Sequence, residues 1–147
     1  MSVTTSAVTP RVTVEQAVDQ IIEKTGGHVR LGLPLGLGKP NQLGNALYQR
    51  VKQHPDLSLQ IYTALSLGRP RAGSDLEKRF LAPFAERVFA DYVELDYLND
   101  LRSRKLPDNI QVFEFFFQPG AMLGNPAAQQ NYISCNYTHA ARDLGAR

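Results

Sequence analysis

The chain has 147 residues, of which 43% are apolar and 20% are charged, a composition typical of an ordinary globular domain with a real core. Its formal net charge is only +2 and no basic stripe runs along it, which argues against a nucleic-acid-binding role. The single cysteine, Cys135, excludes an intrachain disulfide, and no apolar run approaches the roughly 18 residues of a membrane span.

The amino terminus reads MSVTTSAVTP, which is small and polar. It lacks the charged start and apolar centre of a signal peptide. We therefore expect a cytoplasmic protein whose residues 1–11 form a flexible tail, with no membrane partner.

The first predicted element is a helix within TVEQAVDQIIEKTGG. Thr13 followed by Gln16 indicates a capping box, and Gly26 stands where a helix stop belongs. The apolar residues recur at helical spacing and predict one buried stripe: Val14, Ala17, Val18, Ile21 and Ile22.

A strand in HVRLGLPL and a second helix follow. Pro40 suits the first turn of that helix, which should run to about His54, because its fixed φ is already helical. LSLQIYTAL then alternates strictly, which predicts a strand with one apolar face. The residues of that face are Leu57, Leu59, Ile61, Thr63 and Leu65.

After the loop SLGRPRAG, Ser74 and Glu77 indicate a second capping box. The helix that they open should be kinked or split at Pro83. Its apolar residues are Leu76, Phe80, Leu81, Phe84 and Val88. DYLNDLRSRKLP predicts a further short helix.

NIQVFEFFFQPG is a nearly continuous apolar run, which predicts a strand covered on both faces. A short helix, a tight connection and the start of another helix are expected after it. Strands alternating with helices imply an α/β domain over residues 12–147, with a mainly parallel sheet flanked by helices. Because three strands make a thin sheet, we expect this domain to be truncated at its carboxyl-terminal end.

The stretch GLPLGLGKPN raises the question of a phosphate-binding loop. In the P-loop pattern the first glycine would fall at Leu33 and the magnesium-binding Ser or Thr at Pro40, so two fixed positions fail. In the Rossmann pattern the third glycine would fall at Asn41. Two readings remain: a ligand site at a helix start on the carboxyl edge of the sheet, or merely a tight strand-to-helix turn.

Four stretches of the sequence resemble one family of enzymes. LGLPLGLGKPNQLGNALYQR, FLAPFAERVF, and EFFFQPG with NYISCNYTHAARDL are similar to the amino-terminal part of the acetyl-CoA hydrolase/transferase family. That family is grouped with the 4-hydroxybutyrate CoA-transferases among the glutamate-dependent CoA-transferases. The resemblance covers roughly residues 12–145 and implies two related α/β domains with the active site between them.

The resemblance implies transfer of CoA from an acyl-CoA to a small carboxylate, or to water, through a glutamyl-CoA intermediate. Coenzyme A is then a substrate and no cofactor is permanently bound. The family's glutamate lies in a carboxyl-terminal domain, expected here in cis or in trans, so this chain alone is expected to be inactive. No glutamate of the chain is nominated as nucleophile: Glu15, Glu23, Glu77, Glu86, Glu94 or Glu114.

Glu114 is the one glutamate in the apolar strand, where burial would raise its pKa. The alternative is a strand residue that pairs with a neighbouring arginine or faces water.

The resemblance also implies which residues line the acyl-CoA cleft, with Lys39 available to a substrate carboxylate or a CoA phosphate. The cleft residues so implied are Gly36, Gly38, Lys39, Pro40 and Asn41, with Gly120 in a second loop and Asn136, Tyr137 and Thr138 at a helix start.

For the weaker candidate site residues, a structural role stands as an alternative to a functional one. His139 is either an acid/base group or a capping residue, and its pairing with Cys135 lacks further partners for a thiol dyad or a metal site. Arg69 and Arg71 either meet CoA phosphates or lie in a solvated loop. A basic group is expected to end the short helix in solvent: Arg102, Arg104 and Lys105.

A different class of function stays open: a non-catalytic α/β module that binds an acyl-CoA, a nucleotide or a partner chain. A homo-oligomer is compatible with either class. A fragment of an enzyme should expose a large apolar face where the missing part would pack, whereas a module should not.

Overall fold

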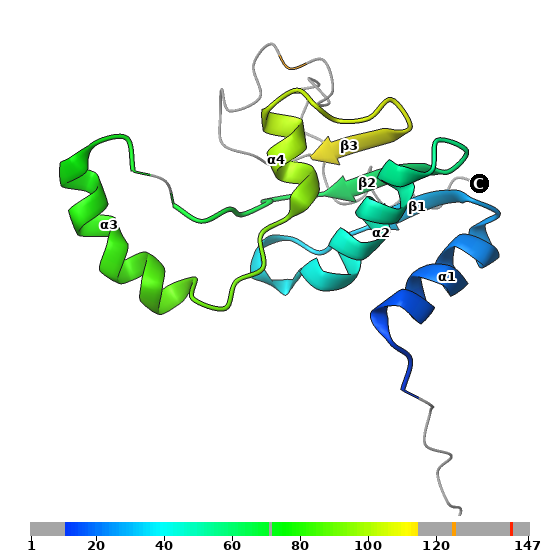
Figure 1. Ribbon diagram of the computed structural model, residues 1–147, viewed down its shortest axis with the longest axis horizontal. Helices are drawn as coiled ribbons and strands as arrows, with labels where there is room; N and C mark the ends of the chain where they lie inside the picture. The colour runs from blue at the N-terminus through cyan, green and yellow to red at the C-terminus, as the bar shows by residue number, and fades with distance from the viewer. Residues whose placement is uncertain (1–10, 71, 115–124, 126–141, 143–147) are drawn as a thin grey trace, which may run out of the picture.

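The computed structural model describes residues 11–70, 72–114, 125 and 142, and it arranges helices around a parallel sheet (Figure 1). The strands β1 (His28–Gly32), β2 (Ser58–Thr63) and β3 (Ile110–Glu114) lie in the order β1-β2-β3, and both pairings are parallel. The helices are α1 (Val14–Thr25), α2 (Asn41–Gln53), α3 (Asp75–Val88) and α4 (Asp96–Arg102), with a 3₁₀ turn, η1 (Gly36–Gly38), before α2. The predicted α/β class with a parallel sheet is confirmed.

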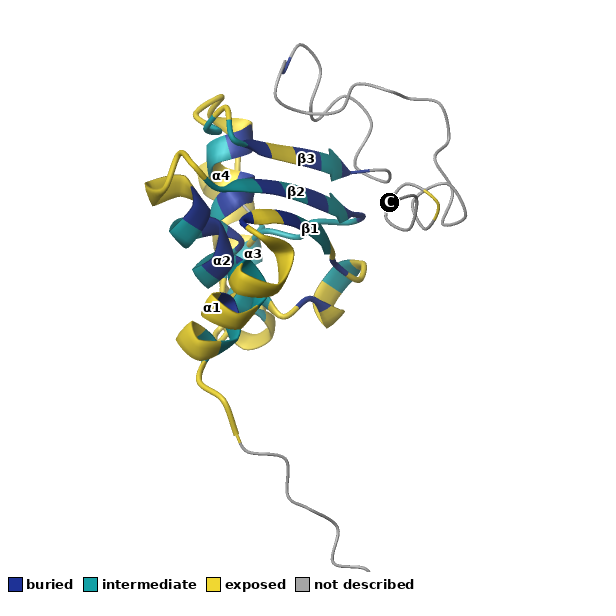
Figure 2. Ribbon diagram, turned by 90° about the vertical axis from the view of Figure 1, so that its right-hand side faces the viewer, coloured by how far each residue is buried: buried dark blue, intermediate teal, exposed yellow. Residues whose placement is uncertain are grey.

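The core lies on one face of the sheet, beneath α1, α2 and α4 (Figure 2). Leu59 and Ile61 of β2 are completely buried there, as the alternation in LSLQIYTAL predicts. Tyr48 of α2 and Tyr97 of α4 meet edge to face, with ring centroids 6.4 Å apart. Burial of these large side chains supplies the main driving force for folding.

The other face of the sheet carries polar and aromatic cross-strand pairs. His28 Nδ1 lies 2.9 Å from Ser58 Oγ, Gln60 donates to Gln111 across 2.9 Å, and the rings of Tyr62 and Phe113 stack with centroids 4.7 Å apart. Such cross-strand pairs contribute directly to the stability of the sheet.

The prediction that β3 is covered on both faces is wrong for its described residues. Ile110, Val112 and Glu114 are buried, whereas Gln111 is exposed and Phe113 is half-buried. The physical reason is that Ile-Gln-Val-Phe-Glu alternates, and the continuous apolar run that suggested two covered faces continues beyond Glu114, outside the described residues.

The capping signals of α1 are confirmed. Thr13 Oγ1 accepts from the backbone N–H of Gln16, and Gln16 Oε1 accepts from that of Thr13. Gly26 ends the helix in the left-handed region, at φ 60°. Pro40, by contrast, precedes α2 as its N-cap, with ψ at 71°, and does not occupy the first helical turn.

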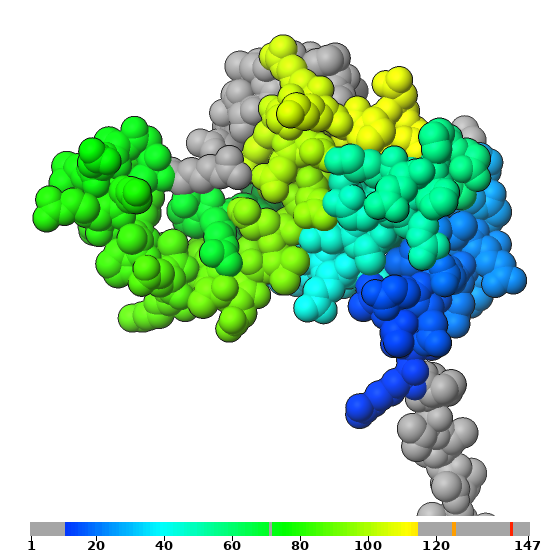
Figure 3. All heavy atoms as spheres, in the orientation of Figure 1, coloured from blue at the N-terminus to red at the C-terminus, as the bar shows by residue number. Residues whose placement is uncertain are grey.

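α3 is one continuous helix through Pro83, so the predicted split does not occur. Ser74 Oγ accepts from the backbone N–H of Glu77, but the Glu77 carboxylate accepts from that of Gly73. No residue of α3 is buried. The helix extends away from the sheet and the other helices (Figures 1 and 3).

Several predictions fall on residues that the structure does not describe. They are the tail up to residue 10 and the elements expected after residue 114, apart from the isolated positions 125 and 142. Within the described ranges, no helix combines the length and the apolar character needed to cross a bilayer.

Candidate functional site

The glycine-rich loop joins β1 to α2 at the carboxyl edge of the sheet. Gly36 has a φ of 63°, which an L side chain rarely adopts, so this position requires glycine. Gly38 has an ordinary φ and open space around it, so the turn alone does not require glycine there. The N-cap residue of α2, Pro40, supplies no side-chain cap hydrogen bond to the first N–H groups of the helix.

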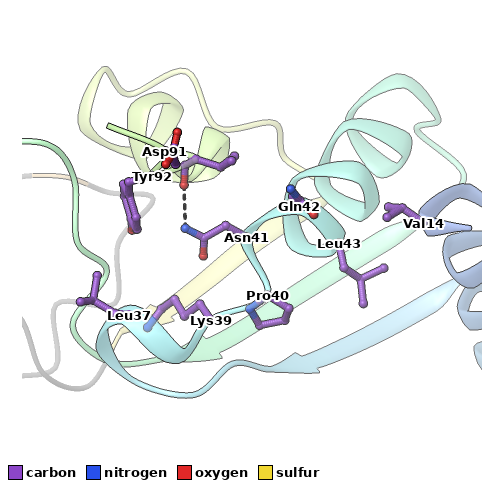
Figure 4. Close-up of a pocket in the computed structure, with 10 residues that line it drawn as sticks. Val14, Leu37, Lys39, Pro40, Asn41, Gln42, Leu43, Asp91 and Tyr92 are labelled. Atoms are coloured by element: carbon purple, nitrogen blue, oxygen red, sulfur yellow. Dashed lines mark hydrogen bonds between the residues drawn. The ribbon is translucent and has the colours of Figure 1, made fainter. Parts of the chain in front are cut away.

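A cavity of about 360 Å³ lies beside the start of α2 (Figure 4). Three of the predicted cleft residues, Lys39, Pro40 and Asn41, line it together with Gln42. Its opposite wall comes from the segment after α3: Asp91, Tyr92 and Val93. The cavity thus lies between the start of α2, with the loop before it, and the segment after α3, which is about 50 positions away in the sequence; Val14 of α1 also lines it.

Asn41 supplies the most informative group in this wall. Its Nδ2 donates to the carbonyl of Val93 across 2.6 Å, which ties the two loops together (Figure 4). Its Oδ1 is buried and has no hydrogen-bond partner among the described residues. A buried acceptor without a donor costs roughly 1–3 kcal/mol, which a donor brought to it would recover.

Lys39 is turned into the protein and is 7% exposed. Its Nζ donates to the carbonyls of Pro34 and Ala64, each across 2.6 Å, and more weakly to that of Leu65. Burial lowers the pKa of this lysine, and the charge of Glu114 opposes that shift. The ammonium is therefore already occupied, and the expected contact with a substrate carboxylate or CoA phosphate would have to break these bonds.

Glu114 is 6% exposed, so the reading in which it faces water is wrong. Its Oε1 accepts from the backbone N–H of Ser66 across 2.6 Å, and Ser66 Oγ lies 2.7 Å from the hydroxyl of Tyr97. Burial raises the pKa of Glu114, against the opposing effects of Ser66, Lys39 and Arg102. The carboxylate holds the chain just after Leu65, whose φ of 49° is strained for a residue with a side chain.

The arginines also take up structural positions. Arg69 Nη2 donates to the carbonyl of Ala90 across 3.0 Å, and its backbone N–H donates to Glu94, so Arg69 anchors the segment after α3. The basic end of α4 is exposed, as expected: Arg102, Arg104 and Lys105. The remaining predicted site residues lie outside the described part of the chain: Arg71, Gly120, Cys135, Asn136, Tyr137, Thr138 and His139.

Sequence reasoning missed the second wall of the cavity and the Ser66–Tyr97 pair. Ser66 could have been found, because it follows a predicted strand at the edge where ligands collect. Asp91, Tyr92 and Val93 belong to no motif, and only the tertiary fold brings them to α2. The described residues contain no group of three His, Cys, Asp or Glu side chains that could hold a metal ion.

No family model, curated protein or solved structure matches this chain.

Proposed function

We propose that this chain is the amino-terminal, acyl-CoA-binding part of a CoA-transferase or acyl-CoA hydrolase. A glutamate from a carboxyl-terminal domain would attack the thioester carbonyl and release CoA thiolate, leaving a mixed anhydride. The thiolate would then attack the glutamyl carbonyl and release the acyl carboxylate, giving glutamyl-CoA. Transfer to a second carboxylate, or to water, would complete the reaction.

The cavity at the start of α2 is the observation that carries this proposal. Its volume of about 360 Å³ suits part of a cofactor-sized ligand. Asn41 Oδ1, which has no partner among the described residues, can accept a hydrogen bond from an amide N–H when its side chain turns toward the cavity, and the pantetheine arm of CoA carries such a group. The start of α2, where Pro40 supplies no side-chain cap, favours a nearby negative group such as a phosphate or carboxylate.

The test places a negative charge at this helix start. Gln42 is exposed and lines the cavity, so Gln42→Glu adds a carboxylate beside the proposed ligand. We expect CoA and acetyl-CoA to bind about fivefold more weakly, because like charges at short range near a protein surface repel by about 1 kcal/mol or more. Affinities are measured by isothermal titration calorimetry.

The matched control is Gln53→Glu, the same change on an exposed residue at the other end of α2. It should leave the affinity for CoA unchanged. A carboxylate in the first turn strengthens a helix by about 0.3–1 kcal/mol, so Gln42→Glu should lose affinity without losing stability. Absence of saturable CoA binding by the unaltered chain, or equal affinities for both variants, would refute the proposal.

A non-catalytic acyl-CoA-binding module is the second candidate, favoured by a cavity whose described lining residues include no glutamate. Both candidates predict CoA binding. Only the enzyme predicts a covalent glutamyl-CoA adduct, detected by intact mass, when a protein that contains both this chain and a carboxyl-terminal domain is incubated with acyl-CoA.

A further inference from the structure

α3 presents an apolar surface that the described part of the chain leaves largely exposed, with Phe84 in edge-to-face contact with the ring of Phe89. Leu76 and Phe80 are 77% and 81% exposed, and Phe84 and Val88 are each 49% exposed. These four residues recur every fourth position, so they form one ridge along the helix. A lone exposed leucine is unremarkable, but a ridge of four large apolar side chains marks an interaction surface.

The ridge borders a hollow on the helix surface. Leu76, Glu77, Phe80 and Leu81 line it. A hollow between side-chain ridges is the feature into which a ridge of another helix packs. The shape of the surface therefore suits a helical partner.

The sequence of α3 is complementary to itself when one copy is reversed about Ala82. Leu76 of one copy then lies level with Val88 of the other, and Phe80 lies level with Phe84. Glu77, which lines the hollow, lies level with Arg87, which follows Phe84 by three positions on the same side of the helix. A parallel arrangement would instead set Glu77 level with Glu77 and Arg87 level with Arg87.

We propose that α3 is a self-association surface, on which α3 of a second copy of this chain packs antiparallel about Ala82. The two-fold arrangement places every contact twice, which is the property of an isologous interface. Apolar ridges supply the attraction, and the Glu77–Arg87 pairs select the antiparallel orientation. This inference does not depend on the proposed function.

The interface should be modest in strength. A helix of 14 residues is about 21 Å long, and one such helix per copy buries less than the roughly 800 Å² per partner of a standard interface. We therefore expect a monomer–dimer equilibrium with a dissociation constant in the micromolar range, about 1–100 µM.

Sedimentation equilibrium of the unaltered chain over about 1–500 µM tests this expectation. The weight-average mass should rise from monomer to dimer across that range. Phe80→Ser should remain monomeric throughout, with an unchanged circular dichroism spectrum because Phe80 contributes nothing to the core. A mass that stays monomeric for the unaltered chain, or a dimer that survives Phe80→Ser, would overturn the proposal.

A charge exchange tests the antiparallel register. Glu77→Lys and Arg87→Glu each set like charges opposite one another, so each variant alone should dimerise at least about fivefold more weakly. Mixing the two variants pairs opposite charges again at both ends, so heterodimers should form with nearly the original affinity. Mixing does not alter the fold of either variant. Recovery of dimers on mixing would therefore come from the restored pairing of opposite charges and not from a change in folding.

Glu86→Lys is the matched control, because Glu86 adjoins Arg87 in sequence but points away from the ridge at helical spacing. It should leave dimerisation unchanged. If mixing fails to restore dimers, the antiparallel register is wrong. If the unaltered chain is monomeric but its ridge becomes protected from hydrogen exchange when a carboxyl-terminal domain is added, that domain is the occupant and the self-association proposal fails.

Discussion

At the scale of single residues, two buried charged side chains organise the carboxyl edge of the sheet. Lys39 ties the loop after β1 to the end of β2 through backbone carbonyls, and Glu114 of β3 holds the backbone N–H of Ser66. Three strand ends are thereby fixed relative to one another. Both groups lose hydration on folding, so their contribution to stability depends on pH.

Glu114→Gln should reveal this pH dependence. Because burial raises the pKa of Glu114 above its ordinary value of 4.5, the folded state binds this proton more tightly than the unfolded state. The stability that Glu114 contributes is thus full at low pH and is lost as pH rises from 4.5 through the raised pKa. The variant lacks this titration, so the unaltered chain should lose stability relative to Glu114→Gln as pH rises.

Urea unfolding of both chains between about pH 4 and pH 8 measures this difference. A constant offset between them would reflect packing and hydrogen bonding that do not titrate, and it does not affect the sign of the slope. If the unaltered chain instead gained relative stability with rising pH, the fold would favour the carboxylate and our assignment of the shift would be wrong.

The roles of individual residues were only partly predictable from the sequence. A tight strand-to-helix turn was one of two readings of the glycine loop, and the structure shows that Gly36 is the glycine that this turn requires. The position of Asn41 beside a helix start was foreseen. The inward turn of Lys39 was not, because it depends on carbonyls 25 and 26 positions away in sequence. The sequence Gly38-Lys39 does not show whether the lysine ammonium points toward a ligand or into the protein.

At the scale of elements, α3 and α4 follow each other in the chain but differ in what holds them. α3 has 14 residues, none of them buried, whereas α4 has 7 and buries Tyr97, Leu98 and Leu101. Local signals predicted both helices, since caps and periodicity are encoded nearby. They could not predict which helix joins the core, because an apolar stripe looks the same whether it faces the sheet or a partner.

A matched pair of leucine truncations checks this contrast. Leu98 is 3% exposed and Leu76 is 77% exposed. Leu98→Ala should cost about 2–5 kcal/mol of unfolding free energy, because it leaves a cavity in the core. Leu76→Ala should cost less than about 0.5 kcal/mol.

Urea unfolding at about 1 µM, where association is weak, makes the comparison clean. Similar losses for both variants would mean that α3 packs against the body of the protein.

At the scale of the whole molecule, the described residues divide into a core on one face of the sheet and a projecting helix. The parallel pairing followed from the alternation of strands and helices in the sequence, whereas the strand order was not predicted. The partial exposure of the second face of β3 was not predicted either, because the apolar run that suggested two covered faces continues past Glu114, outside the described residues.

Native-state hydrogen exchange should show this division directly. We expect the amides of α3 to exchange quickly and those of β2, α2 and α4 to exchange slowly, although α4 has half the length of α3. An isolated helix of about 14 residues is marginal in water, so its protection reports packing. The exchange is measured by mass spectrometry at about 1 µM, and equal protection of α3 and α4 would contradict the division.

One side chain has a consequence for the order in which this fold assembles. Asn109, just before β3, donates through Nδ2 to the carbonyls of Val51 and Leu57, each across 2.9 Å. Those carbonyls take up their positions only when the end of α2 and the turn into β2 have formed. Pairing of β3 with β2 also closes a loop of some 50 residues. We therefore expect β3 to join the sheet last, after β1, α2 and β2 have formed the surface on which it packs.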